Sequence, residues 1–315
     1  MRTWLDTWLV TIHDPTSLAP SAVGLEVVVI TCAVATFIHA LRAHRRGDRL
    51  ALATWLTILI YGVAMEVISY NTVDNFKHAQ FTVMFYEHQL PLYVTAVYPA
   101  FLYTGIATVR RLQLSRWAEP FAAGLVIVAM DFPFDILGPV AGWWTWSNSD
   151  PNLAFRWHGV PVSSYYWHLA FGGVLCWLTR ALGPRTAASR ALWRAAPLAL
   201  LTIVLGVVAF LPFHGLHGLG VAHGTTVAVA LVVSLVIAAQ AAAAARRQAP
   251  GAPDLLLLAV PVLFFGYHLA LAFAVSAGGR LAVICGVTGF AALVNWVAHR
   301  PAADVRRAER LLSPE

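Results

Sequence analysis

Charged residues are scarce in this chain. They make up 11% of 315 residues, whereas a soluble domain carries about 25%. Hydrophobic residues make up 59% and the mean hydropathy is +0.69. This composition excludes an ordinary soluble domain and predicts an integral membrane protein of the all-α class, a multi-pass helix bundle in the cell membrane.

Lysine and cysteine are also nearly absent, and each absence excludes a class of protein. The single lysine, Lys77, lies outside the apolar runs, so no span offers an amine for a retinal Schiff base. The three cysteines lie within apolar runs without paired spacing, which is typical of small buried hydrophobic residues. No basic soluble segment is present, so we expect no nucleic-acid partner and assign the net charge of +6 to surfaces facing anionic membrane lipids.

Nine apolar runs are long enough to cross the roughly 30 Å hydrocarbon layer, which takes about 20 helical residues. Alternate flanks of these runs hold most of the 21 basic residues, and cytoplasmic flanks collect arginine and lysine. The N-terminus is therefore expected outside and the C-terminus in the cytoplasm. The predicted spans are 21–42, 50–70, 89–109, 117–141, 164–182, 195–213, 222–245, 254–275 and 281–299.

The chain is expected to form one transmembrane domain over 21–300 with two short flanking segments. Residues 1–20 carry Trp4 and Trp8 but no small-residue cleavage site, so they are interpreted as an interfacial segment rather than a cleaved signal peptide. Residues 301–315 form a short cytoplasmic tail rich in arginine.

Ionisable side chains inside a membrane are costly and are therefore functional candidates. With the expected topology, such residues fall in the outer half of several spans, whereas the inner halves are almost entirely Leu, Val, Ala and Ile. This asymmetry predicts a polar pocket beneath the outer surface. The candidate catalytic residues are Glu66, Asp131, Asp135 and His168.

A carboxyl group buried without a cation is favoured in its protonated form, which makes it a proton donor. Aromatic faces near such an acid can stabilise a carbocation. We expect the pocket to be lined by Tyr70, Tyr93, Trp144, Trp146, Tyr166 and His268. Two simpler roles stay open: the carboxyl groups could hydrogen-bond a helix break, and the tryptophans could form an interfacial belt.

Protonation of an isoprenoid alkene by these buried acids is the first hypothesis. The second is a metal-dependent lipid hydrolase or oxidase. Three histidines lie within one glycine-rich segment of ten residues, HGLHGLGVAH at 214–223, and neutral imidazoles with a carboxylate are common ligands of divalent metals. The candidate ligands are His214, His217, His223 and Glu87, although the sequence has no HExxH motif. A metal-free site is favoured over this one. A third hypothesis is a non-catalytic protein that binds a lipid or small molecule.

Residues 60–180 resemble the carotenoid hydratase family of membrane proteins. The similarity lies in AMEVISY with Glu66, QLPLYVTAVYPAFLY, MDFPFD with Asp131 followed by GWWTW, and HGVPVSSYYW. It implies a lipid-embedded hydratase or cyclase that acts on the terminal unit of a lipophilic isoprenoid. Glu66 or Asp131 would then be the general acid, and Asp135 and His168 the partner or water-orienting base.

Overall fold

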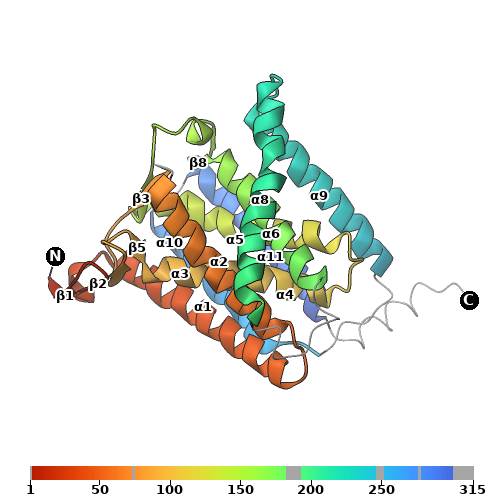
Figure 1. Cartoon of the computed structure of the whole chain (residues 1–315), viewed down its shortest axis with the longest axis horizontal. Coiled ribbons are helices and arrows are strands. Elements are labelled where there is room, and N and C mark those ends of the chain that lie inside the picture. The colour runs from red at the N-terminus through yellow and green to blue at the C-terminus, as the bar shows by residue number, and fades with distance from the viewer. Residues whose placement is uncertain (1, 73–74, 182–192, 246–251, 276–277, 301–315) are drawn as a thin grey trace, which may run out of the picture.

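The computed structural model describes residues 2–72, 75–181, 193–245, 252–275 and 278–300, and this part of the chain is mainly helical (Figure 1). The third apolar run is a composite helix in which a π-helical turn, η2, separates α3 from α4. The long helices are α1 (Pro20–Arg45), α2 (Ala51–Thr72), α3–η2–α4 (Leu92–Tyr98, Pro99–Tyr103, Thr104–Arg111), α5 (Glu119–Val140), α6 (Val162–Ala181), α8 (Ala195–Gly218), α9 (His223–Ala245), α10 (Leu255–Ala274) and α11 (Gly279–His299).

Eight helices of the described chain are long and apolar enough to cross a membrane, which confirms the multi-pass helical class. Helix α6 coincides with the remaining predicted span but is not among these eight. Its first two turns carry the polar sequence SSYYWH, which lowers its hydropathy. The expected ninth span therefore stays a prediction.

Helix α5 lies at the centre of the bundle. It contacts α4, α6, α9, α10 and α11, and 89% of its apolar stretch is buried, against 11% for α9. Small residues permit this packing: a Cβ atom at Gly124 would lie 2.7 Å from the backbone oxygen of Leu169 on α6. Pro133 and Pro139 lie inside α5, yet the helix continues to Val140. Residues on α5 are therefore the most completely enclosed in the molecule.

Short strands form the connections at one end of the bundle, which we call the strand-bearing end (Figure 1). A four-stranded antiparallel sheet has the order β1 (Thr3–Asp6), β2 (Val10–His13), β4 (Val83–Phe85) and β5 (Leu90–Pro91). Strand β3 (Phe76–His78) pairs with β6 (Trp144–Trp146), so the α2–α3 and α5–α6 connections are hydrogen-bonded to each other at this end of the bundle. Strands β7 (Arg156–Trp157) and β8 (Val160–Pro161) form a small hairpin, and η1 (Pro15–Ser17) and η3 (Pro151–Leu153) are short helical turns.

The N-terminal segment predicted at the interface is folded as the β1–β2 hairpin and attached to β4. Trp4 and Trp8 are exposed on it, at 65% and 70%, and their contact with lipid headgroups stays a prediction. The predicted cytoplasmic tail, residues 301–315, lies outside the described residues.

Candidate active site

Two carboxyl groups lie one turn apart on α5, toward the strand-bearing end. Asp131 and Asp135 are 2% and 4% exposed, and they lie close enough to interact electrostatically. The hydroxyl of Ser164 on α6 donates a hydrogen bond of 2.6 Å to Oδ2 of Asp135. The spacing of four residues places both carboxyl groups on the face of α5 that packs against α6.

His168, one turn after Ser164, lies beside this pair. Its Nδ1 is 3.2 Å from Oδ2 of Asp131 and 3.0 Å from the backbone oxygen of Ser164. A carbonyl oxygen can only accept, so Nδ1 carries the hydrogen and directs it at Ser164. Oδ2 of Asp131 therefore receives no hydrogen bond within the described chain, and Nε2 of neutral His168 keeps its lone pair.

Glu66 joins the group from α2. The hydroxyl of Tyr98 donates a hydrogen bond of 2.7 Å to Oε1, whereas Oε2 is buried without a partner among the described residues. The approach of Tyr98 requires a glycine, because a Cβ atom at Gly62 would lie 2.4 Å from the tyrosine ring. Tyr98 is also the last residue of α3 before the π-helical turn, a feature frequent at functional sites.

These groups form one electrostatic unit, which we call the carboxyl cluster: Glu66, Asp131, Asp135 and His168. Glu66 interacts electrostatically with His168, which in turn interacts with Asp135. No lysine or arginine of the described ranges forms an ion pair with any of the three acids. The structure thus brings together all four residues predicted as catalytic.

Aromatic rings cover the carboxyl cluster on the side of the strand-bearing end. Trp144 lies 4.7 Å from Phe134 and 6.1 Å from Trp146 between ring centroids, and Phe134 lies 6.2 Å from both Tyr93 and His268. A Cβ atom at Gly138 would lie 2.0 Å from the Trp144 ring, so this tryptophan packs directly on the α5 backbone. We call this layer the aromatic wall, and its predicted members are Tyr70, Tyr93, Trp144, Trp146 and His268.

Tyr166 was predicted to line the same site, but the structure places its side chain toward α8 instead. Its ring packs against Phe210 and Phe213 of α8, 5.3 and 5.5 Å away, and its hydroxyl donates to the backbone oxygen of Ala209. The adjacent Tyr165 takes the expected place: it stacks on Phe132 at 4.1 Å and interacts electrostatically with Asp131 and Asp135. Successive residues point about 100° apart on a helix, which explains the exchange.

Comparison with known families gives one match. A family model described as "Domain of unknown function (DUF7802)" matches residues 3–276. The chain belongs to this DUF7802 family. No curated protein and no solved structure matches it. The matched range contains the whole carboxyl cluster and the whole aromatic wall, so both belong to the DUF7802 domain, and nothing in the comparisons links this domain to carotenoid hydratases.

One residue of the DUF7802 site was missed by the sequence analysis. His78, on β3, lies 5.8 Å from Tyr93 and 6.2 Å from Trp144 between ring centroids, and its Nδ1 is 3.0 Å from the Tyr93 hydroxyl. Burial lowers the pKa of His78 to about 3, so the imidazole is neutral at physiological pH. Its Nε2 is buried without a partner in the described chain. The neighbouring Lys77 made this segment look like an exposed loop, and only the pairing of β3 with β6 turns His78 inward.

The sequence analysis also missed Glu26, a buried acid on α1 whose hydrogen bonds connect two parts of the fold. Its carboxylate accepts hydrogen bonds from the backbone N–H of Thr82 at 3.1 Å and from the Thr82 hydroxyl at 2.5 Å. Both bonds attach α1 to the turn before β4. Glu26 therefore serves as a reference for a buried acid of the DUF7802 domain whose hydrogen bonds are provided by the fold.

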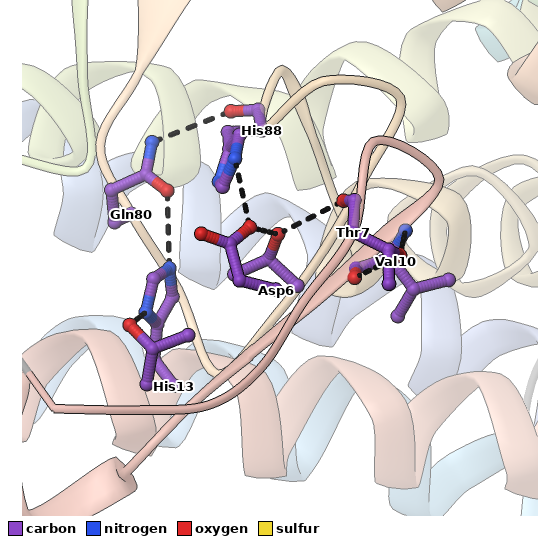
Figure 2. Close-up of polar contacts among 8 residues, drawn as sticks. Asp6, Thr7, Val10, His13, Gln80 and His88 are labelled. Atoms are coloured by element: carbon purple, nitrogen blue, oxygen red, sulfur yellow. Dashed lines mark hydrogen bonds and ion pairs between the residues drawn. The ribbon is translucent and has the colours of Figure 1, made fainter.

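The predicted metal ligands are not assembled. His217 and His223 stack with ring centroids 3.9 Å apart, but the described residues contain no group of three or more His, Cys, Asp or Glu side chains placed to hold a metal ion. Glu87 lies instead beside the N-terminal hairpin, where its N–H donates to the Trp8 oxygen at 2.9 Å. Its neighbour His88 pairs with Asp6 at 3.3 Å and its carbonyl accepts from Gln80 (Figure 2).

Proposed function

We propose that this protein is a membrane-embedded enzyme that protonates a carbon–carbon double bond of a lipophilic isoprenoid, as a hydratase or a cyclase. The observation that carries the proposal is the carboxyl cluster: three enclosed acids that have no lysine or arginine partner among the described residues, next to the aromatic wall. The similarity of residues 60–180 to carotenoid hydratases supports the same chemistry. The proposal includes nine spans in the cell membrane with the N-terminus outside, so that the site lies in the outer half of the bilayer.

The proposed reaction begins with proton transfer from Asp131 or Glu66 to one alkene carbon. Two acids one turn apart in an apolar interior cannot both be charged at low cost, so one of the α5 pair holds a proton for this step. The resulting carbocation is stabilised by the electron-rich faces of Trp144 and Tyr93. No redox partner is needed, because a proton is the only species transferred.

The second step quenches the cation. In a hydratase, the oxygen of a water molecule bonds to the carbocation and one water proton passes to the Nε2 lone pair of His168, with Asp135 stabilising the imidazolium. In a cyclase, a second double bond of the substrate attacks and a proton is lost from carbon to the same base. Either way the base takes up one proton for the one that the acid donates, and proton exchange within the cluster restores the starting state.

The test is turnover of acyclic isoprenoid hydrocarbons by the full chain in lipid nanodiscs, in deuterated water, with products analysed by mass spectrometry. Deuterium bound to carbon with gain of one water indicates hydration, and deuterium without gain of water indicates cyclisation. Asp131→Asn and Glu66→Gln are expected to abolish incorporation, and Glu26→Gln is the matched control because it changes a buried acid outside the cluster. Isoprenoid binding without turnover would contradict the proposed enzymatic activity and favour the hypothesis of a non-catalytic binding protein.

Elemental analysis of the purified protein tests the metal hypothesis separately. A stoichiometric transition metal that disappears in His214→Ala/His217→Ala, together with loss of activity, would contradict the acid mechanism. Full activity of this double variant would show that neither His214 nor His217 takes part in the reaction.

A further inference from the structure

A cavity of about 220 Å³ lies at the end of the bundle opposite the strand-bearing end, between the last turns of α1 and the first turn of α10. It is lined by His39, Arg42, Ala43, Arg46, Pro253, Asp254, Leu255 and Leu256. One wall is cationic and another is apolar. The cavity is separate from the carboxyl cluster, and the proposed function does not use it.

Hydrogen bonds fix the acidic side of this cavity. Oδ1 of Asp254 caps α10 by accepting from the N–H groups of Leu256 and Leu257, both at 3.1 Å. Oδ2 lies 3.4 Å from Nε2 of His39, whose Nδ1 is 2.8 Å from the Tyr103 hydroxyl. With Tyr103 donating to Nδ1, the neutral imidazole donates from Nε2 to Asp254. The carboxylate of Asp254 is therefore occupied by the helix cap and by His39.

The cationic side is not neutralised. Arg46 is the C-cap of α1, and its N–H donates to the Arg42 carbonyl at 3.1 Å, so the two arginines lie one turn apart at the end of this helix. Both side chains line the cavity, and neither forms an ion pair within the part of the chain that the structure describes. The nearby Asp48 accepts from the backbone N–H of Leu50 and Ala51 instead. Two guanidinium groups thus line one cavity, and the only carboxylate in its lining, Asp254, is paired with His39 and the α10 N–H groups and not with either arginine within the described chain.

We propose that this cavity binds a phosphate ester, held by Arg42 and Arg46. Guanidinium groups match the tetrahedral phosphate with paired hydrogen bonds. The apolar wall of Ala43, Leu255 and Leu256 suits the carbon part of such an ester. The cavity lies at the ends of two membrane-crossing helices, where lipid phosphates are found, and the same chemistry accepts a free phosphate ester.

The experiment is calorimetric titration of the detergent-purified full chain with two probes, dioctanoyl phosphatidic acid and glycerol phosphate. Dioctanoylglycerol, which lacks phosphate, is the negative control. We expect saturable binding of a phosphate probe that weakens at least about tenfold in Arg42→Gln/Arg46→Gln. Binding of the lipid alone assigns a headgroup site, and equal binding of both probes assigns a site for a free ester.

Arg45→Gln is the matched control, since Arg45 has the same charge and the same turn of α1 but does not line the cavity. Ala43→Phe fills the cavity and leaves both arginines in place, so it is expected to block binding without removing charge. An equal effect of Arg45→Gln would overturn the proposal, because it would reduce the effect to general surface charge. Unaltered binding in Ala43→Phe, or no saturable binding of either probe, would overturn it too.

Discussion

The two ends of α5 hold buried acids in opposite surroundings. Glu119, in the first turn, is 1% exposed and pairs with two arginines: Arg180 contacts Oε2, and Nε of Arg110 lies 3.7 Å from Oε1. Asp131 and Asp135, three and four turns later, are as deeply buried, but their polar partners include Ser164 and His168 and no lysine or arginine of the described chain.

This difference separates a structural acid, Glu119, from the acids that we propose are reactive. A buried carboxylate with two cations is held in its charged form and stabilises the helix contacts around it, which leaves it unsuited to donate a proton. Asp131 and Asp135 lie beside aromatic rings and have no lysine or arginine partner among the described residues, so either of them retains a proton at lower cost. The same helix thus joins the part of the fold that holds α4, α5 and α6 together to the part that we propose performs chemistry.

The largest effect is expected from Glu119→Ala. Removing this carboxylate takes the shared anion away from Arg110 and Arg180, whose side chains are partly exposed, and empties a buried position between α4, α5 and α6, so we expect a loss of about 3 kcal/mol in stability. The measurement is the thermal unfolding midpoint in detergent. The control is Glu26→Gln, which changes a buried acid that forms no ion pair with an arginine of the described residues. A wild-type midpoint for Glu119→Ala would show that the ion pairs contribute nothing.

Asp131→Asn is expected to have the opposite profile. Its activity should fall at least about a hundredfold, as for loss of a general acid, while the unfolding midpoint stays close to that of the wild type because no cation loses its partner. Turnover of isoprenoids and the unfolding midpoint, measured on the same preparation, check both halves. Strong destabilisation with retained activity would mean that the two ends of α5 have been assigned in reverse.

Gly62→Ala sharpens the comparison at Glu66. The added Cβ atom would lie 2.4 Å from the Tyr98 ring, so Tyr98 must move and its hydrogen bond to Glu66 must lengthen or break. We expect a loss of about 2 kcal/mol in stability together with reduced turnover. Gly266→Ala on α10 is the control, since its Cβ atom would meet nothing within 4 Å. Equal midpoints for the two variants would contradict close packing at Gly62.

The sequence predicts the helices well because each long apolar run carries its own signal. The positions of Glu66, Asp131, Asp135 and His168 toward one end also follow from counting residues along these runs, and the structure brings the four side chains together. The direction in which a side chain points is harder to predict. Tyr165 and Tyr166 are adjacent and equally plausible in the sequence, and only the packing of α6 against α5 and α8 decides which of them faces the carboxyl cluster.

Contacts between distant segments could not be predicted. Glu119 becomes a structural acid because Arg110 and Arg180, from two other helices, reach it, whereas the sequence presents both arginines only as flanking charges. The three-residue strands β3 and β6 are too short to give a periodic signal. Their pairing turns His78 toward Tyr93, and this placement was therefore missed.

The smallest expected effect is a pH dependence that arises from His78. The folded protein holds the pKa of His78 at about 3 by burial, whereas an unfolded histidine titrates near 6.5. Between these values the unfolded chain binds a proton that the folded chain does not, so stability is complete above pH 6.5 and falls as the pH decreases. From pH 7 to 5 we expect His78 to account for a loss of about 1 kcal/mol, allowing for the partial accessibility of the loop.

Unfolding midpoints of the wild type and of His78→Gln, compared at both pH values, isolate this residue from the other histidines. Identical pH slopes would mean that His78 takes up its proton in the folded state, and the aromatic wall would then be open to water on the side of β3.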